Sequence, residues 1–255
     1  MKENRINIFG SHISITNLDE TLCYLKNYDF LTPHYICFPN VYVTMLCYDN
    51  PKFQQIINSS CMSLPDGKPL ELYARIKGNR SMSTVSGFWL IKALLKTDFT
   101  HYFYGSNEET LELLKREMDS NFPKANILGF KSPPFVDLQS IVNNSIINND
   151  IVNINKLKPD FIWVGLSSPK QDMLMKYFYP KLDHGLMMGV GAVFNYLSGS
   201  VQISPEWMKK LSLRWVYRLY KEPRRLWKKY IFGNSLFLFL VVAELIKRLT
   251  KSNRR

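Results

Sequence analysis

The sequence has few of the residues that form metal sites or disulfide frameworks. Its 255 residues include four cysteines and four widely scattered histidines, and they contain no Asp-x-Asp pair. These absences argue against a metal site and a disulfide scaffold, so we expect no bound metal and no cofactor. Reduced cysteines fit a cytoplasmic compartment. All four lie in apolar stretches without CxxC spacing: Cys23, Cys37, Cys47 and Cys61.

Long hydrophobic runs are also missing. Met1–Phe9 is polar and charged, unlike the apolar core of a secretory signal. Near the other end, the apolar run Leu236–Ala243 has eight residues, whereas a bilayer-spanning helix needs about 20. We therefore expect this run to lie at a membrane interface. Packing against the protein itself or against a second copy of the chain is the alternative, so a homo-oligomer stays open.

Positive charge is concentrated at one end of the chain. The whole sequence has 33 Lys and Arg against 21 Asp and Glu, a net charge of +12. Residues 205–255 hold 14 basic and three acidic residues, or +11, which leaves 19 basic and 18 acidic residues, or +1, in residues 1–204. Such a cationic segment predicts an anionic partner such as a diphosphate or an acidic lipid surface. A solvated charged face is the simpler alternative.

Short apolar runs alternate with amphipathic segments through the near-neutral part of the chain. This alternation predicts an α/β fold, Rossmann-like, with a largely parallel sheet flanked by helices. We expect residues 1–204 to form this domain and residues 205–255 to form a helical appendage. The predicted strands are His34–Phe38, Cys61–Leu64, His101–Tyr104, Ala125–Gly129, Phe161–Gly165 and Leu186–Val190.

Helix starts support this fold class. Ser106 or Asn107 is a suitable N-cap for a helix beginning at Glu108, and Ser168-Pro169 is suited to open a helix that reaches Tyr177. The Asn- and Ile-rich segment 143–155 is expected to be a surface helix without chemistry of its own.

Polar residues and glycines follow several predicted strands. In open α/β sheets ligands bind at the carboxyl ends of strands, so Asp66, Gly105 and the loop containing Ser168 and Gln171 are candidate site residues. Pro65-Asp66-Gly67 alone is more often a turn. Small hydroxyl residues before a helix favour phosphate, although a simple helix cap also explains them.

Two further glycines, Gly189 and Gly191, follow the last predicted strand. Phe194 stands where a dinucleotide fingerprint needs a small residue, so an NAD site is not expected. The glycines still allow a sugar nucleotide to approach the backbone closely, and Asn195 can donate and accept hydrogen bonds to it.

The appendage combines basic and aromatic residues. Trp207, Leu211 and Trp215 repeat at four-residue spacing beside basic residues, which predicts an amphipathic helix. Pro223 suits the first turn of a second helix, expected to end near Tyr230. Trp and Tyr beside Lys and Arg are typical of a segment lying in a lipid headgroup layer.

These segments together resemble the WecG/TagA/CpsF family of bacterial glycosyltransferases, from about Asn40 to Tyr230. The resemblance depends on the order of the motifs, since each one alone is weak. In chain order they are Pro65-Asp66-Gly67, Ser168-Pro169-Lys170-Gln171-Asp172, Gly189-Val190-Gly191-Ala192-Val193-Phe194, Trp215-Val216-Tyr217-Arg218-Leu219 and Glu222-Pro223-Arg224-Arg225-Leu226-Trp227.

The resemblance implies an inverting, metal-independent transferase. It would move an N-acetylmannosamine-type or related sugar from a UDP-sugar to an undecaprenyl-diphosphate-linked GlcNAc-type acceptor, at the cytoplasmic face of the bacterial membrane, in cell-surface polysaccharide synthesis. It also implies residue roles. Asp66 would be the base and Asn40 would lie near the sugar. Gly105, Ser168, Gln171, Gly189, Gly191 and Asn195 would lie near the nucleotide, and Arg218, Arg225 and Lys228 would contact the diphosphate.

Spacings of seven and three would place Arg218, Arg225 and Lys228 on one helical face if the helix persists past Pro223. The family commonly has Phe-Asp where this chain has Phe194-Asn195, so a different hexose donor such as UDP-glucose stays open. A non-catalytic, membrane-peripheral anion-binding protein is a further alternative. A nucleic-acid partner is not expected, because it would leave Asp66 and the glycine loops unexplained.

Overall fold

A computed structural model describes residues 4–134, 145–202, 204–205, 208 and 214–252. Its centre is a six-stranded sheet whose neighbouring strands all pair in parallel, in the order β4-β3-β8-β7-β5-β6. The predicted α/β class and all six predicted strands are confirmed. The strands of this sheet are β3 (His34–Cys37), β4 (Met62–Ser63), β5 (Thr100–Gly105), β6 (Asn126–Lys131), β7 (Phe161–Gly165) and β8 (Leu186–Gly189).

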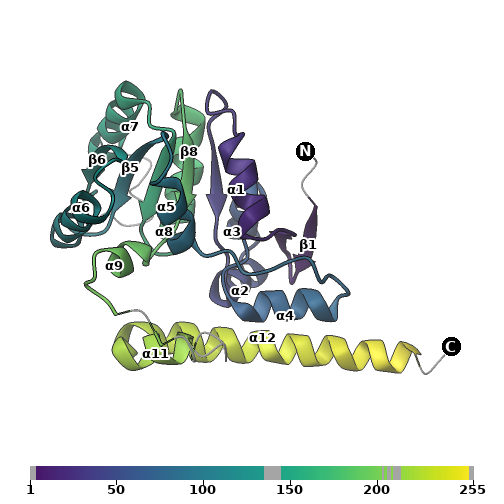
Figure 1. The fold of residues 1–255 in the computed structure, drawn as a ribbon. Coiled ribbons are helices and arrows are strands. Elements are labelled where there is room, and N and C mark those ends of the chain that lie inside the picture. The colour runs from purple at the N-terminus through teal and green to yellow at the C-terminus, as the bar shows by residue number, and fades with distance from the viewer. Residues whose placement is uncertain (1–3, 135–144, 203, 206–207, 209–213, 253–255) are drawn as a thin grey trace.

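Helices cover both faces of the sheet (Figure 1). Side chains alternate along the central strand β7: Phe161 and Trp163 enter one core, and Ile162 and Val164 enter the other. This period of two, with both faces buried, is typical of a parallel sheet. On the Trp163 face lie α1 (Leu18–Lys26), α5 (Gly87–Leu94), α6 (Glu108–Asn121) and α9 (Val193–Leu197). On the Ile162 face lie α2 (Val41–Asp49), α3 (Pro51–Asn58), α7 (Ser145–Leu157) and α8 (Lys170–Phe178).

The two helix starts lie close to the positions predicted. The side chain of Asn107, not Ser106, caps α6 by accepting a hydrogen bond of 3.0 Å from the backbone N–H of Thr110. The helix α8 begins at Lys170, directly after Pro169. In α7, Asp150 is buried and accepts a 2.8 Å hydrogen bond from the Tyr104 hydroxyl, so this helix is tied to the end of β5.

The first strands, β1 (Arg5–Ile8) and β2 (Ser11–Ser14), form an antiparallel hairpin that the sequence analysis did not anticipate. Phe9 and Gly10 both have positive φ angles, 49° and 93°, as a two-residue hairpin turn requires. The Asn7 side chain supports the turn by accepting a 2.8 Å hydrogen bond from the Gly10 N–H. The hairpin lies beside β4, where the Ser63 N–H donates to the Ser14 hydroxyl at 2.8 Å.

The described part of the appendage consists of α11 (Arg214–Lys221) and α12 (Pro223–Ser252). The second helix does not end near Tyr230 as expected. It continues through Gly233 and the apolar run to Ser252 and has 30 residues in all. It lies along the lower edge of the molecule in Figure 1, beside α4 (Lys68–Ile76). Tertiary burial explains the length, because packing overrides the weak helix propensity of Gly233 and its neighbours. Trp207 and Leu211 lie outside the described residues, and the expected division between residues 204 and 205 stays a prediction.

Candidate active site

The ends of five adjacent strands bring the candidate residues to one edge of the sheet. Because all strands of this sheet are parallel, the residues that follow them lie on the same side. Residues from five separate sequence segments therefore gather there, on loops and in the first turns of the helices that follow them. Asn40 follows β3, Asp66 follows β4, Gly105 ends β5, Ser168 and Gln171 follow β7, and Gly189, Gly191 and Asn195 lie at or after the end of β8.

Asn40 and Asp66 lie on neighbouring loops. The backbone N–H of Asp66 donates a 2.9 Å hydrogen bond to the carbonyl of Pro39, the residue before Asn40. The side-chain oxygen of Asn40 caps α2 by accepting from the Val43 N–H at 3.1 Å, which leaves its amide N–H groups for another partner. Both side chains are half-buried. The backbone hydrogen bond therefore holds the loops that carry Asn40 and Asp66 together at this edge of the sheet.

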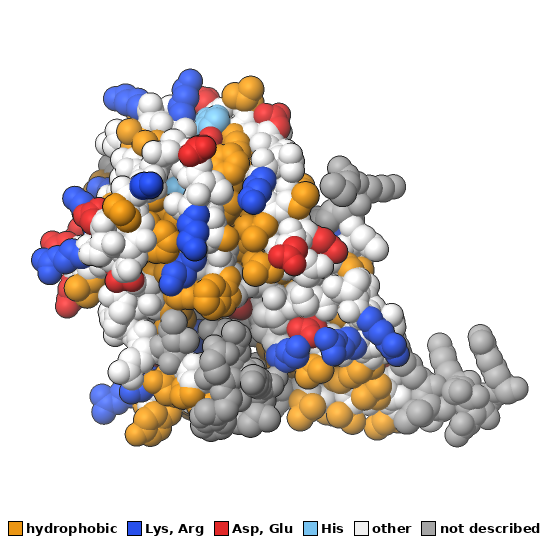
Figure 2. Space-filling model, in the orientation of Figure 1, with side chains coloured by type: hydrophobic (Ala, Val, Ile, Leu, Met, Phe, Trp, Pro, Cys, Tyr) orange, Lys and Arg blue, Asp and Glu red, His pale blue; other side chains and the backbone are white. Residues whose placement is uncertain are grey.

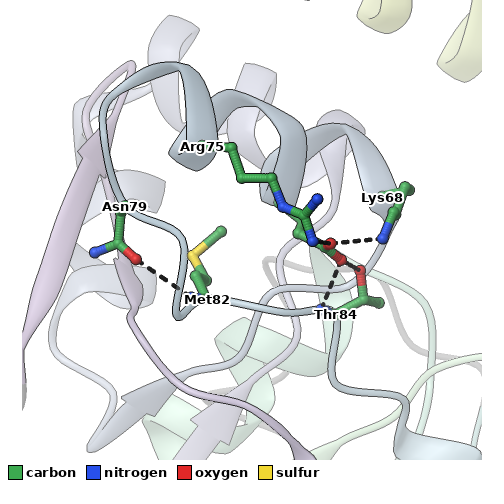
Figure 3. A network of polar contacts seen from close by, with 6 residues as sticks. Lys68, Arg75, Asn79, Met82 and Thr84 are labelled. Atoms are coloured by element: carbon green, nitrogen blue, oxygen red, sulfur yellow. Dashed lines mark hydrogen bonds and ion pairs between the residues drawn. The ribbon is translucent and has the colours of Figure 1, made fainter.

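The buried carboxylate of Glu71 stabilises the start of α4, the helix that follows Asp66. Glu71, in the first turn of α4, accepts hydrogen bonds from Lys68 at 2.5 Å and from Arg75 at 2.7 Å. It also accepts from the backbone N–H and the hydroxyl of Thr84, both at 3.2 Å (Figure 3). Burial alone would raise the pKa of Glu71, but the hydrogen bonds from Lys68 and Thr84 and the two cations hold it below its usual value. Glu71 therefore stays ionised and links α4 to the segment that contains Thr84.

Glycines close the ends of β5 and β7. Gly105 pairs with Gly165 and has φ +129°. A Cβ at Gly105 would lie 2.7 Å from the backbone carbon of Gly165, and a Cβ at Gly165 would lie 2.3 Å from the Phe194 ring. Both glycines therefore have a packing reason to be present, in addition to any contact with a ligand.

Gln171 joins the loop after β7 to the loop after β8. Its side-chain N–H donates to the Gly189 carbonyl at 2.9 Å and to the Ser168 hydroxyl at 3.3 Å. The other side-chain atom, Oε1, is buried and has no hydrogen-bond partner among the described residues. A Cβ at Gly191 would lie 3.5 Å from that oxygen. Gln171 thus holds the two glycine-containing loops together and retains an acceptor directed at them.

Asp172, the next residue, is buried beneath the site and was not a candidate from the sequence. Burial raises its pKa to about 6, although hydrogen bonds with Ser168 and Cys37 offset part of this effect. Its Oδ2 atom has no hydrogen-bond partner among the described residues. Asp172 therefore contacts the end of β3 and the loop after β7 at once. It lies in the first turn of α8 and ends the motif Ser168-Pro169-Lys170-Gln171-Asp172, but its burial was not expected from the sequence.

We expect Asp172→Asn to stabilise the protein at neutral pH and not in acid. Asp172 loses its proton above a pKa of 3.8 when unfolded and of about 6 when folded, so the wild type loses stability as the pH rises from about 4 to about 6. This difference in pKa corresponds to about 3 kcal/mol in the free energy of unfolding. Denaturant unfolding of both proteins at pH 4 and pH 7.5 measures this. The exposed Asp183→Asn is the control, and an equal gain at both pH values would contradict the assignment.

A second buried group, His101, also makes the stability of the protein depend on pH. It is buried at the amino end of β5, where burial lowers its pKa to about 4 and the Trp163 indole donates to its Nδ1 at 3.2 Å. Because unfolded histidine binds a proton below about pH 6.5, this residue makes the protein less stable as the pH falls toward 4. The two contributions have opposite signs over the same range, so only the difference between variants isolates Asp172.

A small hollow, open to solvent, lies between α9 and α11. The Arg218 guanidinium is 6.0 Å from the centre of the Tyr196 ring, within cation–π range. Asn195 and Arg218 are therefore neighbours, although they are 23 positions apart in the sequence. The lining residues are Ala192, Asn195, Tyr196, Val201, Gln202, Tyr217, Arg218, Lys221 and Glu222.

The condition set for Arg218, Arg225 and Lys228 to share one helical face, a helix that persists past Pro223, is not met. The chain bends at Glu222, between the end of α11 and the start of α12, so the helix does not persist past Pro223. Proline lacks the N–H that would continue α11. The side chains of Arg225 and Lys228 lie outside the described residues.

Within residues 4–134, 145–202 and the described tail, no three His, Cys, Asp or Glu side chains are grouped so that they could hold a metal ion. Metal independence itself stays a prediction.

Comparison with known proteins places this arrangement in a family. The sequence matches the family described as "Glycosyl transferase WecG/TagA/CpsF family" over residues 6–251. A protein of Bacillus subtilis (strain 168), named N-acetylglucosaminyldiphosphoundecaprenol N-acetyl-beta-D-mannosaminyltransferase, is 26% identical over 213 residues, covering 79% of this chain and 79% of the relative. A protein of the same name from Bacillus spizizenii is 25% identical over 235 residues, covering 89% of this chain and 82% of the relative. The family match extends over nearly the whole chain, and the chain is therefore a glycosyltransferase that belongs to the WecG/TagA/CpsF family.

Proposed function

We propose that this glycosyltransferase moves an N-acetylmannosamine-type or related sugar from a UDP-sugar to an undecaprenyl-diphosphate-linked GlcNAc-type acceptor. The names of both relatives support this donor and acceptor class. The observation that carries the proposal is the position of Asn40 and Asp66, on neighbouring loops at the same sheet edge as the glycine-containing loops after β7 and β8. The loop that carries the proposed base and the loops proposed to hold the nucleotide thus lie at one edge of the sheet.

In the proposed reaction Asp66 is the general base. The acceptor hydroxyl attacks the anomeric carbon of the donor from the side opposite UDP, and Asp66 takes the hydroxyl proton as the new C–O bond forms. The bond to UDP breaks, and UDP leaves with the electron pair, which inverts the anomeric configuration. The side-chain amide of Asn40 supports this step by donating a hydrogen bond to the sugar.

The departing diphosphate needs positive charge, which the appendage supplies. Arg218 and Lys221 line the hollow beside Asn195, and a guanidinium at this place would stabilise the negative charge that develops on UDP. We propose the same role for Arg225 and Lys228. In the absence of a metal, these side chains would carry out the neutralisation.

The appendage also suits a membrane surface. Figure 2 shows hydrophobic side chains gathered along the edge where α4 and α12 lie, next to a row of Lys and Arg. No described helix is long and apolar enough to cross a membrane. A helix with an exposed apolar face near basic residues binds in the headgroup layer, so we propose that the enzyme works at the inner leaflet. The exposed apolar residues of α12 are Trp227, Ile231, Leu238, Phe239, Val242 and Ile246.

The proposal is tested by measuring UDP release. The full-length protein is incubated with a panel of UDP-sugars, including UDP-N-acetylmannosamine and UDP-glucose, and with a polyprenyl-diphosphate-GlcNAc acceptor, in EDTA. We expect release that depends on the acceptor and persists in EDTA. Release restored only by added Mg²⁺ or Mn²⁺ would contradict metal independence. Absence of both turnover and UDP binding would favour the anion-binding alternative.

A further inference from the structure

The last helix has two faces of different kinds. Phe237 and Val241 are buried, with 7% and 9% of their surface exposed, whereas their neighbours Leu238 and Phe239 are 63% and 67% exposed. Because residues four apart lie on the same side of a helix, one side of α12 faces the protein and the other faces solvent. The exposed side belongs to the surface described above. The buried side is the subject of the inference.

The buried side of α12 completes a third hydrophobic core, separate from the two that cover the sheet. This core joins α12 to the first turns of α2 and α4. Val41, which enters it, follows Asn40 directly, and Leu70 lies in the first turn after Asp66 and Gly67. Its buried members are Ile8, Ile13, Val41, Met45, Leu70, Tyr73, Ala74, Met82, Phe237 and Val241.

Aromatic contacts fix the centre of this core. The Phe237 ring packs edge-on against Phe9, with centroids 5.6 Å apart, and lies 6.2 Å from the Tyr73 ring of α4. Phe9 and Tyr73 are 5.1 Å apart, so the three rings form one cluster. Such pairs contribute beyond the apolar area that they bury. Loss of Phe237 would leave a void directly against α4.

Two further contacts tie α12 to the same helices. The Glu244 carboxylate accepts hydrogen bonds from the Tyr73 hydroxyl and the Lys77 ammonium group, both on the α4 side. Toward α2, Gly233 is buried, and a Cβ there would lie 3.7 Å from the Cα of Tyr42. The backbones of α12 and α2 therefore approach closely at the second residue of α2.

We infer that α12 is a positioning element of the active site, whose buried residues Phe237, Val241 and Glu244 fix the starts of α2 and α4. This inference rests on the proposed function, since it takes Asn40 and Asp66 as reacting-site residues. The helix acts on them through α2 and α4, with which it shares the third core. It sets where their helices begin, and the hydrogen bond from Asp66 to Pro39 joins the two starts into one unit.

The consequence is that the same helix has two tasks. Its outer side suits the lipid surface, and its inner side holds the catalytic loops, so removal of the appendage would change the active site as well as membrane binding. Donor binding depends on the loops after β7 and β8, which the third core does not include. Damage to the inner side should therefore lower kcat more than it raises the KM for the donor.

The test compares Phe237→Ala with Phe237→Leu in the full chain, using a short-chain acceptor in detergent so that vesicle binding plays no part. We expect Phe237→Ala to lower kcat on the order of 10- to 100-fold, since misplacement by about 1 Å can cost that much. The KM for the donor should change less than about twofold, and leucine should restore most of kcat. An unchanged kcat in a folded Phe237→Ala protein would overturn the inference.

Hydrogen exchange supplies a readout that does not need activity. Backbone amides of residues 41–46 and 68–74 should exchange faster in Phe237→Ala, while those of β7 and β8 stay protected. Phe239→Ala, a matched change on the outer side, should leave exchange in both segments unchanged. Equal effects of the two variants would overturn the inference. If the wild type turns over no donor, the proposed function fails, but this comparison still decides whether α12 holds α2 and α4.

If Phe237→Ala does not fold, Glu244→Gln provides the same test with a smaller perturbation. It keeps the shape of the side chain and removes the charge that pairs with Lys77. We expect a loss of about threefold to tenfold in kcat, which corresponds to about 1 kcal/mol of activation free energy. Faster exchange should be confined to residues 68–74. Wild-type kcat and wild-type exchange in this variant would contradict the role of Glu244.

Discussion

Asp66→Asn should reduce sugar transfer by about 10²- to 10⁴-fold, the usual contribution of a general base. The amide has nearly the shape of the carboxylate but cannot accept the proton of the acceptor hydroxyl. The backbone hydrogen bond from residue 66 to Pro39 does not involve the side chain, so the loop should keep its conformation. UDP binding should be retained, because the loops proposed to hold the nucleotide follow β7 and β8. Steady-state UDP release and UDP titration measure the two effects.

Asp66→Glu is the control for this prediction. It keeps the charge and moves it by one methylene, so we expect a smaller loss than for the amide. Thermal unfolding of both variants checks that the fold is intact. An Asp66→Asn enzyme that keeps more than a tenth of wild-type kcat would show that another group accepts the proton.

Gly105→Ala should have the largest effect on stability. At φ +129° a side chain is strained, and the added Cβ would lie within 2.9 Å of three backbone atoms of Gly165. Backbone strain and overpacking each cost about 1–3 kcal/mol, so we expect the free energy of unfolding to fall by about 2–6 kcal/mol. The ends of β5 and β7 would separate, and donor binding should weaken with them. Chemical denaturation and UDP titration follow the two changes.

Gly78→Ala separates the two causes. Gly78 also has a positive φ, +89°, but a Cβ there would meet nothing within 4 Å. This variant should therefore show the backbone cost alone, about 1–3 kcal/mol, and no change in UDP binding. Equal destabilisation by the two alanines would mean that the contact with Gly165 contributes nothing.

The strands of the sheet were predictable because their sequence pattern is local. Runs such as Phe161–Gly165 are short, apolar and followed by glycine or turn residues. Such a run is typical of a strand in a parallel sheet, because both faces of that sheet are buried. The positions of Asp66, after β4, and of Gln171, in the helix start after β7, followed from the same pattern. The hairpin β1–β2 was missed, because its strands have four residues each and its turn depends on Phe9 with a positive φ.

The carboxylates Glu71 and Asp172 could not be found in the same way. Each is charged, and charged residues in helices usually face solvent. Glu71 is buried because Thr84, from a later segment, and two cations of its own helix satisfy it. Asp172 is buried because α8 packs against the end of β3, more than 130 residues earlier in the chain. The burial of these two carboxylates therefore cannot be predicted from the residues next to them in the sequence.

The sequence by itself determined the α/β class, the strand ends where site residues gather, the cationic tail and, by its motifs, the family. These properties depend on local periodicity, composition and motif order, which the chain carries before it folds. Only the tertiary structure decided that α12 is one continuous helix, that it bends away from α11 at Glu222, and that its inner side shares a core with the helices after Asn40 and Asp66. The physical reason is that burial joins residues about 200 positions apart, such as Val41 and Phe237, and no local pattern records which apolar face will meet which.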